Sequence, residues 1–347
     1  MKIAIATVQV PFITGGAELH AKMLRDELIK RGHQADIVTI PFKWYPPVKI
    51  VDCMMMGRMM DLSEVNGEKI DKVIALKFPA YYVRHPHKVL WILHQHRQAY
   101  DLWGTEYGDL HKEKNGKDVR SLIKSCDDRY ILEAEHIYTN AQNTANRLKK
   151  YNRIEAEALY HPPLNYEKFY CEGYGDFIFY ASRIDFMKRQ RMLVEAMRYT
   201  KTGVRAVLAG TGSEKEIRYL EGIIRKNRLQ DKVQMTGFLS EEQKILNYAQ
   251  CLGVYFGAYD EDYGYITLES FFSKKPVIVH KDAGGPLEFV ENGKNGYVLE
   301  PTPQKVAEKL DEWYLSREIA KRMGEEGHRT MQEKHIDWDY AIYKLLQ

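Results

Sequence analysis

Short apolar runs alternate with longer amphipathic stretches along the first half of the chain. The apolar runs are residues 2–8, 35–40, 72–76, 89–93 and 137–139. Residues 18–31, between the first two runs, have the spacing of a helix with one apolar face. Runs that are apolar throughout are typical of strands buried on both sides of a parallel sheet. The pattern therefore predicts βαβ units and an α/β fold.

The same pattern starts again in the second half of the chain. Its apolar runs are residues 177–180, 205–209, 233–236, 253–256 and 276–279, with a helical stretch at 189–198. His161-Pro162-Pro163 separates the two halves, and consecutive prolines interrupt regular structure. Because 347 residues suffice for two domains, we expect doubly wound, Rossmann-like domains at 1–163 and 164–330, facing a central cleft.

Helical patterning resumes at Pro303 and ends in an aromatic-rich segment that contains Trp338 and Tyr343. We treat 331–347 as a separate C-terminal helical segment. Its periodicity leaves two placements open, on the second domain or back across to the first. Open α/β sheets bind ligands at the carboxyl ends of their strands, so the expected site lies where two such edges meet.

Composition and charge narrow the function. The chain has 51 Lys and Arg against 48 Asp and Glu, a net charge of +3, which is too small an excess for nucleic acid as the main partner. Its four cysteines form no CxxC pair, which favours a reducing, cytoplasmic compartment. The apolar N-terminal run is short and is followed by Gly15-Gly16, so we interpret it as a buried strand rather than a signal peptide. No run reaches about 18 apolar residues, the length of a membrane span.

Several turns between strand and helix carry residues suited to a phosphorylated sugar ligand. Gly15 and Gly16 open the first helix, where small residues let backbone N–H groups approach an anion; a plain tight turn is the competing interpretation. Arg183 and Lys188 flank the turn after a second-half strand, and two cations at such a position can clamp a diphosphate. Solvated surface charges are the alternative there.

Two carboxylates follow in the most informative stretch, residues 259–269. Glu261 precedes a turn at Gly264, and Glu269 lies on the helix that the turn begins. A carboxylate offers two acceptor oxygens to sugar hydroxyls. After the next strand, Gly284 and Gly285 form another glycine turn before a helix. Each feature is ordinary alone, but their order and spacing are not.

Together these motifs resemble the retaining glycosyltransferases of the GT-B fold, family 4 (glycosyl transferases group 1). The second half matches the family's basic pair, its E-x7-E motif and its Gly-Gly-Pro-x-Glu turn with Arg183 and Lys188, Glu261 and Glu269, and Gly284-Gly285-Pro286-Leu287-Glu288. In the first half, Gly15-Gly16-Ala17-Glu18 is similar to the family's Gly-Gly loop, and His94 to its active-site histidine. The resemblance covers nearly the whole chain and is most specific in the second half.

The resemblance implies a role for each matching residue. Arg183 and Lys188 would hold the donor diphosphate, Glu269 the ribose hydroxyls, and Glu261 the donor sugar without a covalent role. His94 is the expected catalytic histidine, although His96 is close enough in sequence to take its place. The remaining donor-binding residues are expected to act largely through backbone atoms; they are Gly15, Gly16, Gly237, Phe238, Asp262, Tyr263, Gly264, Tyr265, Gly284 and Gly285.

The activity implied is transfer of a hexose-type sugar from a nucleoside diphosphate sugar to an acceptor hydroxyl, with retention and without metal or cofactor. The acceptor would be a glycan, a lipid-linked molecule or a small molecule. The alternatives are a non-catalytic sugar-nucleotide binding protein and a dinucleotide-dependent oxidoreductase, although the first turn lacks G-x-G-x-x-G. Two metal sites are further alternatives. One is a D-x-D cation site at Asp260-Glu261-Asp262, and the other is a zinc site from His94 and His96, which would share a face of a strand, with His85 and His87.

Residues 42–60 combine aromatic, basic and methionine side chains: Phe42-Lys43-Trp44-Tyr45-Pro46-Pro47-Val48-Lys49, then Met54-Met55-Met56-Gly57-Arg58-Met59-Met60. One interpretation is a core-facing helix after a Pro-Pro turn. The other is a surface at the acceptor side that contacts a membrane or an apolar acceptor tail, with Lys43, Lys49 and Arg58 facing lipid phosphates.

Overall fold

The computed structural model describes residues 1–13 and 15–347 and divides the chain into two compact units. Unit 1 comprises residues 1–164 and 337–347, and unit 2 comprises residues 165–336. Each unit contains a six-stranded parallel sheet, which confirms the predicted α/β fold class. Unit 1 extends one residue beyond the expected boundary at 163, and the C-terminal segment joins it from Asp337 onward rather than from residue 331.

The sheet of unit 1 has the strand order β2-β1-β5-β6-β7-β8. The chain enters at the second position and later adds strands on the other side of β1, which makes the sheet doubly wound. The strands are β1 (Lys2–Gln9), β2 (Gln34–Pro41), β5 (Lys72–Ala75), β6 (Lys88–Ile92), β7 (His136–Thr139) and β8 (Glu157–Ala158). A separate two-stranded hairpin joins β3 (Glu64–Val65) and β4 (Glu68–Lys69).

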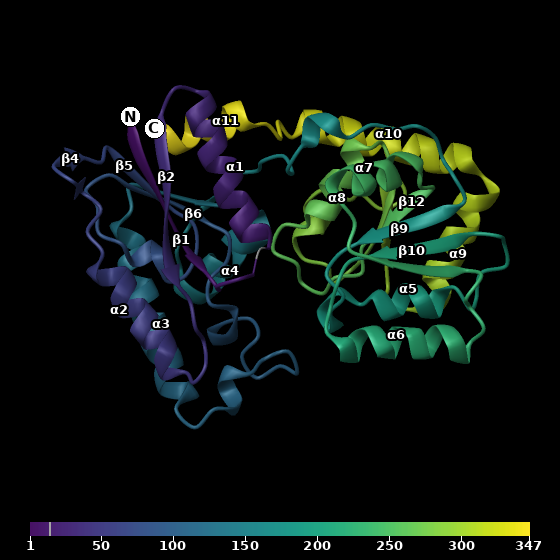
Figure 1. Ribbon diagram of the computed structural model, residues 1–347, viewed down its shortest axis with the longest axis horizontal. Coiled ribbons are helices and arrows are strands. Elements are labelled where there is room, and N and C mark those ends of the chain that lie inside the picture. The colour runs from purple at the N-terminus through teal and green to yellow at the C-terminus, as the bar shows by residue number, and fades with distance from the viewer. Residues whose placement is uncertain (14) are drawn as a thin grey trace. The chain divides into compact units, whose positions relative to one another are not determined.

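Five helices accompany this sheet: α1 (Gly16–Lys30), α2 (Val48–Met59), α3 (Gly116–Tyr130), α4 (Gln142–Asn152) and α11 (Trp338–Leu346). In Figure 1, α2 and α3 run close together, whereas α1 lies beside α11. The C-terminal helix α11 is held by Trp338, which is 3% exposed and packs against Trp91 of β6 and His161. The aromatic residue noted in the C-terminal segment thus anchors that segment to the strand core of unit 1.

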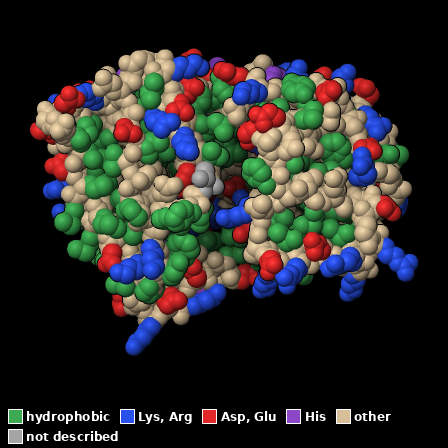
Figure 2. Space-filling view, in the orientation of Figure 1, with side chains coloured by type: hydrophobic (Ala, Val, Ile, Leu, Met, Phe, Trp, Pro, Cys, Tyr) green, Lys and Arg blue, Asp and Glu red, His purple; other side chains and the backbone are tan. Residues whose placement is uncertain are grey.

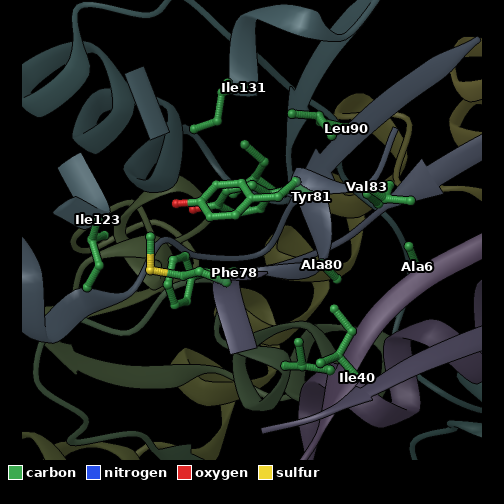
Figure 3. Packing of buried hydrophobic residues seen from close by; sticks show 14 of the residues in the cluster. Ala6, Ile40, Phe78, Ala80, Tyr81, Val83, Leu90, Ile123 and Ile131 are labelled. Atoms are coloured by element: carbon green, nitrogen blue, oxygen red, sulfur yellow. The ribbon is translucent and has the colours of Figure 1, made fainter. Parts of the chain in front are cut away.

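The core of unit 1 contains a buried carboxylate among tyrosines. Figure 3 shows Phe78, Ala80 and Tyr81 in the middle of the apolar cluster that surrounds them. Asp127 of α3 is fully buried there and accepts hydrogen bonds from the hydroxyls of Tyr81 (3.0 Å), Tyr82 (2.6 Å) and Tyr100 (2.7 Å). Burial raises the pKa of Asp127 to about 7, although the three hydroxyls act in the opposite direction.

We expect Asp127 to make the stability of the protein depend on pH. Its pKa is higher in the folded chain than the ordinary value of 3.8, so the folded state holds a proton that the unfolded state has lost. The stabilisation by Asp127 is therefore complete below about pH 4 and is lost as pH rises through 7. Chemical denaturation from pH 4 to 8 should show the free energy of unfolding falling in wild type relative to Asp127→Asn. A constant difference between the two would contradict the assignment.

Unit 2 has the strand order β11-β10-β9-β12-β13-β14, again with all pairs parallel. The strands are β9 (Phe177–Ala181), β10 (Arg205–Ala209), β11 (Val233–Gly237), β12 (Gly253–Tyr255), β13 (Val277–His280) and β14 (Gly296–Leu299). The first strand of the unit, β9, lies in the middle, and the order reverses between β9 and β12. This reversal is the topological switch point, where such sheets bind ligands.

Helices cover both faces of the second sheet. They are α5 (Gln190–Ala196), α6 (Glu214–Lys226), α7 (Glu241–Gln250), α8 (Tyr265–Phe272), α9 (Pro303–Leu315) and α10 (Arg317–Glu333). Figure 1 shows α5 and α6 on one side of the sheet and α7 and α8 on the other. Across the described ranges 1–13 and 15–347, none of the helices combines the length and the apolar character that a membrane crossing needs.

Candidate functional site

Two loops lie side by side at the carboxyl edge of the sheet in unit 2. One follows β12 and the other follows β13, and these strands are neighbours. The loops continue the pairing of their strands through backbone hydrogen bonds. Asp260 N donates to Asp282 O (2.7 Å), Glu261 N to Ala283 O (2.7 Å) and Gly285 N to Glu261 O (2.8 Å). The predicted E-x7-E and Gly-Gly motifs are therefore one structural assembly.

Glycine is required at two positions of this assembly. Gly264 begins α8 at φ +89°, a conformation that side chains with a Cβ rarely adopt. At Gly285, a Cβ would lie 2.4 Å from the carbonyl oxygen of Asp262. The two glycines thus let one loop approach the other closely.

The structure brings together two of the residues expected to bind the donor, Lys188 and Glu261. Lys188 ends a short 3-10 helix, Phe186–Lys188, that follows β9, and β9 lies next to β12. Its ammonium forms an ion pair and hydrogen bond with the Glu261 carboxylate, and both side chains are about three-quarters buried, at 21% and 26% exposed. The Lys188 carbonyl also accepts a hydrogen bond from Tyr180 (2.5 Å). Cation and carboxylate therefore face each other across the switch point.

Sequence reasoning missed a second ion pair beside the first. Arg189 donates two parallel hydrogen bonds to Asp282, both 2.9 Å, and its side chain is 11% exposed. Its guanidinium also stands over the ring of Tyr259, 5.0 Å from the centroid. Such a bidentate pair fixes the geometry of both groups. It ties the loop after β9 to the loop after β13, 93 positions apart in the chain.

Arg183 is placed differently from Lys188. It follows β9 directly, its side chain is 69% exposed, and its nearest carboxylate is Asp185 at 3.6 Å. Among the described residues, no ion pair or hydrogen bond joins Arg183 to Lys188 or Glu261. The predicted basic pair thus consists of one exposed arginine and one lysine already held by a carboxylate.

Glu269 is buried on α8 and held by two residues of α7. Lys244 Nζ lies 2.9 Å from Oε1, and the Tyr248 hydroxyl donates to Oε2 at 2.8 Å. Lys244 and Tyr248 are four positions apart and so share one face of the helix. Burial alone would lower the pKa of Lys244, but Glu269 and Glu241 raise it overall. Sequence reasoning found the carboxylate but not its supports, although the spacing of Lys244 and Tyr248, four positions apart, was a usable signal.

Gly237 and Phe238 stand at the end of β11. Gly237 has φ +70°, and its carbonyl accepts a hydrogen bond from Gly210 N at 2.7 Å. Phe238 is 77% exposed, so its ring is available to a flat ligand. The two glycine-containing turns after β10 and β11 are therefore joined at the same sheet edge.

The expected residues of unit 1 lie at the carboxyl edge of its own sheet. Gly15 precedes α1, and its N–H donates to the Glu18 carboxylate at 2.8 Å, a capping interaction. Any anion at this turn would have to compete with Glu18. His94 is half-buried, with Nδ1 2.7 Å from the carbonyl of Gln95. His96 is instead buried against the rings of Phe42 and Phe78.

The histidines considered for zinc do not converge. His85 and His87 precede β6, whereas His94 and His96 follow it and are not on a strand, contrary to the zinc hypothesis. His85 is held by the carbonyl of Ile70 and His87 by Glu135. In the described part of the chain, no three His, Cys, Asp or Glu side chains cluster as they would around a metal ion.

Comparison with known proteins agrees with the arrangement in unit 2. Residues 172–330 match the family model described as glycosyl transferases group 1. An uncharacterized glycosyltransferase of Methanocaldococcus jannaschii is 24% identical to this chain, over 90% of the chain and 88% of the relative. The human alpha-1,3/1,6-mannosyltransferase ALG2 is 25% identical, over 67% of the chain and 64% of the relative.

Solved structures are similar over the whole chain. Sucrose-phosphate synthase of Thermosynechococcus elongatus gives a TM-score of 0.76 at 15% identity, covering 100% of this chain and 98% of that one. HepE of Anabaena, solved in complex with UDP and glucose, gives 0.69 at 15% identity, covering 100% and 99%. These likenesses show the GT-B fold, in which two Rossmann-like halves each carry a parallel sheet.

Proposed function

We propose that this chain, which has the GT-B fold and whose residues 172–330 match the glycosyl transferases group 1 family, is a glycosyltransferase. It would transfer a hexose-type sugar from a nucleoside diphosphate sugar to an acceptor hydroxyl with retention. The observation that carries the proposal is the cluster at the switch point of unit 2. There the Lys188–Glu261 pair and the glycine-lined backbone of residues 262–264 and 284–285 share one sheet edge. This cluster and the family match favour sugar transfer over the two alternatives, an oxidoreductase and a non-catalytic binding protein.

We expect Lys188 to pair with the Glu261 carboxylate in the absence of donor and with the donor diphosphate when the donor binds. Without donor, its ammonium is neutralised by Glu261. A donor diphosphate carries more charge than the carboxylate and offers several oxygens, so it would draw the ammonium to itself. Glu261 would then accept hydrogen bonds from hydroxyls of the donor sugar. Arg183, whose guanidinium is exposed, would bind the same phosphates.

Stabilisation of the leaving diphosphate is the proposed source of catalysis. Bond cleavage at the anomeric carbon leaves negative charge on the phosphate oxygen, and preorganised cations are most effective where charge develops. Lys188 and Arg183 would supply that charge without a metal ion. His94 of unit 1 would be the catalytic histidine. Glu261 receives no covalent role in this scheme.

The nucleoside would be bound by Glu269 at the ribose and by the turn of Gly237 and Phe238 at the base. Carboxylates suit vicinal hydroxyls because each oxygen accepts a separate hydrogen bond. The HepE structure holds UDP and glucose, so uridine nucleotides are the first donors to test. The acceptor would be a glycan, a lipid-linked molecule or a small molecule, and the process glycan or glycoconjugate biosynthesis.

The proposal predicts slow donor hydrolysis even without acceptor, since water can replace the acceptor hydroxyl. Incubation with UDP-glucose, GDP-mannose or ADP-glucose should release the diphosphate from one of the three, and EDTA should leave the rate unchanged. Proton NMR during the first minutes should show the α-anomer of the sugar. Release of the β-anomer would contradict retention, and restoration of an EDTA-treated sample by Mg²⁺ would favour the D-x-D alternative.

We also propose that unit 1 contacts a membrane surface through α2, with the cytoplasm as the location. The core-facing interpretation holds for Ile50, Cys53 and Met54, which are buried. Met55, Met56 and Met59 are instead 59%, 42% and 73% exposed. Figure 2 shows hydrophobic side chains gathered over the part of unit 1 where Figure 1 places α2. Flexible methionines adapt to irregular apolar surfaces.

Of the three cations expected to face lipid, Arg58 has another partner. It donates to Glu133 at 2.6 Å and lies over the Tyr130 ring. Lys43 and Lys49 are exposed, with Lys49 paired to Asp52. We expect wild type to sediment with anionic liposomes at low salt and to be released at high salt. Met55→Ser with Met59→Ser should abolish sedimentation, whereas Leu132→Ser, an exposed apolar control, should not.

A further inference from the structure

Unit 1 contains a small pocket lined in part by Trp44 and Tyr45 of the segment 42–60 and by His96. It is formed by the segment after β2 and by the loop after β6, so it opens at the carboxyl edge of the sheet. Its volume is about 190 Å³. Pockets for drug-sized ligands measure roughly 300–1,000 Å³, so this one has room for a single ring. The lining residues are Trp44, Tyr45, Pro47, Ile50, His96, Asp109, Leu110 and Glu113.

The walls of the pocket combine two aromatic rings with unpaired acceptors. Trp44 and Tyr45 are 37% and 59% exposed and meet edge to face. Asp109 and Glu113 are exposed, and within the described ranges their carboxylates form no ion pair or side-chain hydrogen bond. Unpaired carboxylates beside an aromatic face are suited to a ring that is apolar on one side and carries hydroxyl donors at its edge.

His96 adds an independent sign that the pocket takes a polar ligand. It is 9% exposed, and its Nε2 is buried with no hydrogen-bond partner among the described residues. Burial lowers the pKa of His96 to about 3, so the ring is neutral at pH 7. A buried polar atom without a partner destabilises the folded state. His96 is also one of the lining residues, so a ligand hydroxyl in the pocket is the candidate partner for this nitrogen.

The charge of the lining argues against an anionic occupant. Asp109 and Glu113 are the charged residues among those that line the pocket, and both are acidic. Lys43 lies nearby over the ring of Tyr45, 5.3 Å from its centroid, but does not line the pocket. A phosphate would meet two carboxylates, whereas a neutral hydroxylated ring would meet two acceptors.

We infer that this pocket binds a neutral pyranose ring, the acceptor-side sugar of the reaction, which makes the acceptor a carbohydrate or a glycoside. That the bound sugar is the acceptor rests on the proposed transfer function. That the pocket binds a sugar does not. Trp44 would pack against the C–H face of the ring. Asp109 and Glu113 would accept hydrogen bonds from its hydroxyls.

Saturation-transfer difference NMR tests the pocket directly, because it detects weak ligands. The probes are the methyl glycosides of glucose, mannose and galactose in both anomeric forms, with glucose 6-phosphate as the anionic comparison. At least one glycoside should receive saturation from the wild-type protein, and glucose 6-phosphate should receive less. Trp44→Ala, and separately the double variant Asp109→Asn/Glu113→Gln, should each reduce the signal by about tenfold.

Glu106→Gln is the matched control, an exposed carboxylate of the same loop that does not line the pocket, and it should leave the signal intact. Calorimetry with UDP, GDP and ADP on the same samples separates this inference from the proposed function. If no glycoside receives saturation, or if glucose 6-phosphate receives more than the glycosides, the pocket does not bind a neutral sugar, even if a nucleotide binds elsewhere on the protein. If the glycoside binds wild type but not the pocket variants, the sugar assignment is supported, whether or not a nucleotide binds. Absence of nucleotide binding would contradict the proposed transfer function instead.

Discussion

Replacing Lys188 with alanine is expected to lower the rate of donor turnover by about two to three orders of magnitude, as when one preorganised electrostatic donor is removed from an active site. The variant loses the charge that would stabilise the leaving diphosphate. It also leaves the Glu261 carboxylate, now three-quarters buried and unneutralised by Lys188, beside the phosphates. Repulsion therefore adds to the lost attraction. Turnover is measured as diphosphate release, and affinity by calorimetry with the nucleoside diphosphate.

Two further variants make this result specific. Lys188→Ala/Glu261→Gln removes the repulsive carboxylate, so it should recover part of the diphosphate affinity but not the rate. Lys309→Ala is the control, because it removes a half-buried lysine that pairs with Glu312 on α9. Its donor turnover and its diphosphate affinity should both stay at the wild-type level. If Lys188→Ala binds and turns over the donor as wild type does, the proposed clamp is wrong.

The fold was predictable because its signal is local. The central strands of both sheets are mostly apolar, and in β5, β6, β12 and β13 every residue is buried. Such runs appear in the sequence whatever their partners are. The placement of the C-terminal helix was not predictable in the same way. It depends on Trp338 fitting beside Trp91 and His161, and periodicity carries no information about which surface an aromatic residue meets.

The candidate site shows the same division. Gly264, Gly285 and Glu269 could be identified because their motifs are short and their order along the chain is distinctive. The partners of these residues come from distant segments: Arg189 reaches Asp282 across 93 positions, and Lys244 reaches Glu269 across 25. The ion pair between Lys188 and Glu261 could not be predicted either, because the sequence motifs indicate a donor-binding role for each of the two residues. Sequence motifs locate the groups but not the interactions that they form without ligand.

Glu269→Gln is expected to weaken nucleoside diphosphate binding by about 10- to 100-fold, the range for losing hydrogen bonds to a charged group. The ribose hydroxyls would lose an ionised acceptor, and the amide cannot accept from both at once. Lys244→Met should weaken binding as well, because it removes the cation that pairs with this buried carboxylate and holds it in place. Their effects should not add, since both act through one carboxylate.

A nucleotide lacking the ribose hydroxyls distinguishes this binding role from a structural one. Wild type should bind 2′,3′-dideoxyuridine diphosphate much more weakly than UDP, whereas Glu269→Gln should bind the two alike. Glu221→Gln, an exposed carboxylate on α6, should discriminate as wild type does. Circular dichroism melting confirms that each variant is folded at the temperature of the binding experiment. Should Glu269→Gln still prefer the ribonucleotide by the wild-type factor, the carboxylate does not bind the ribose, and its contacts with Lys244 and Tyr248 serve only to join α7 to α8.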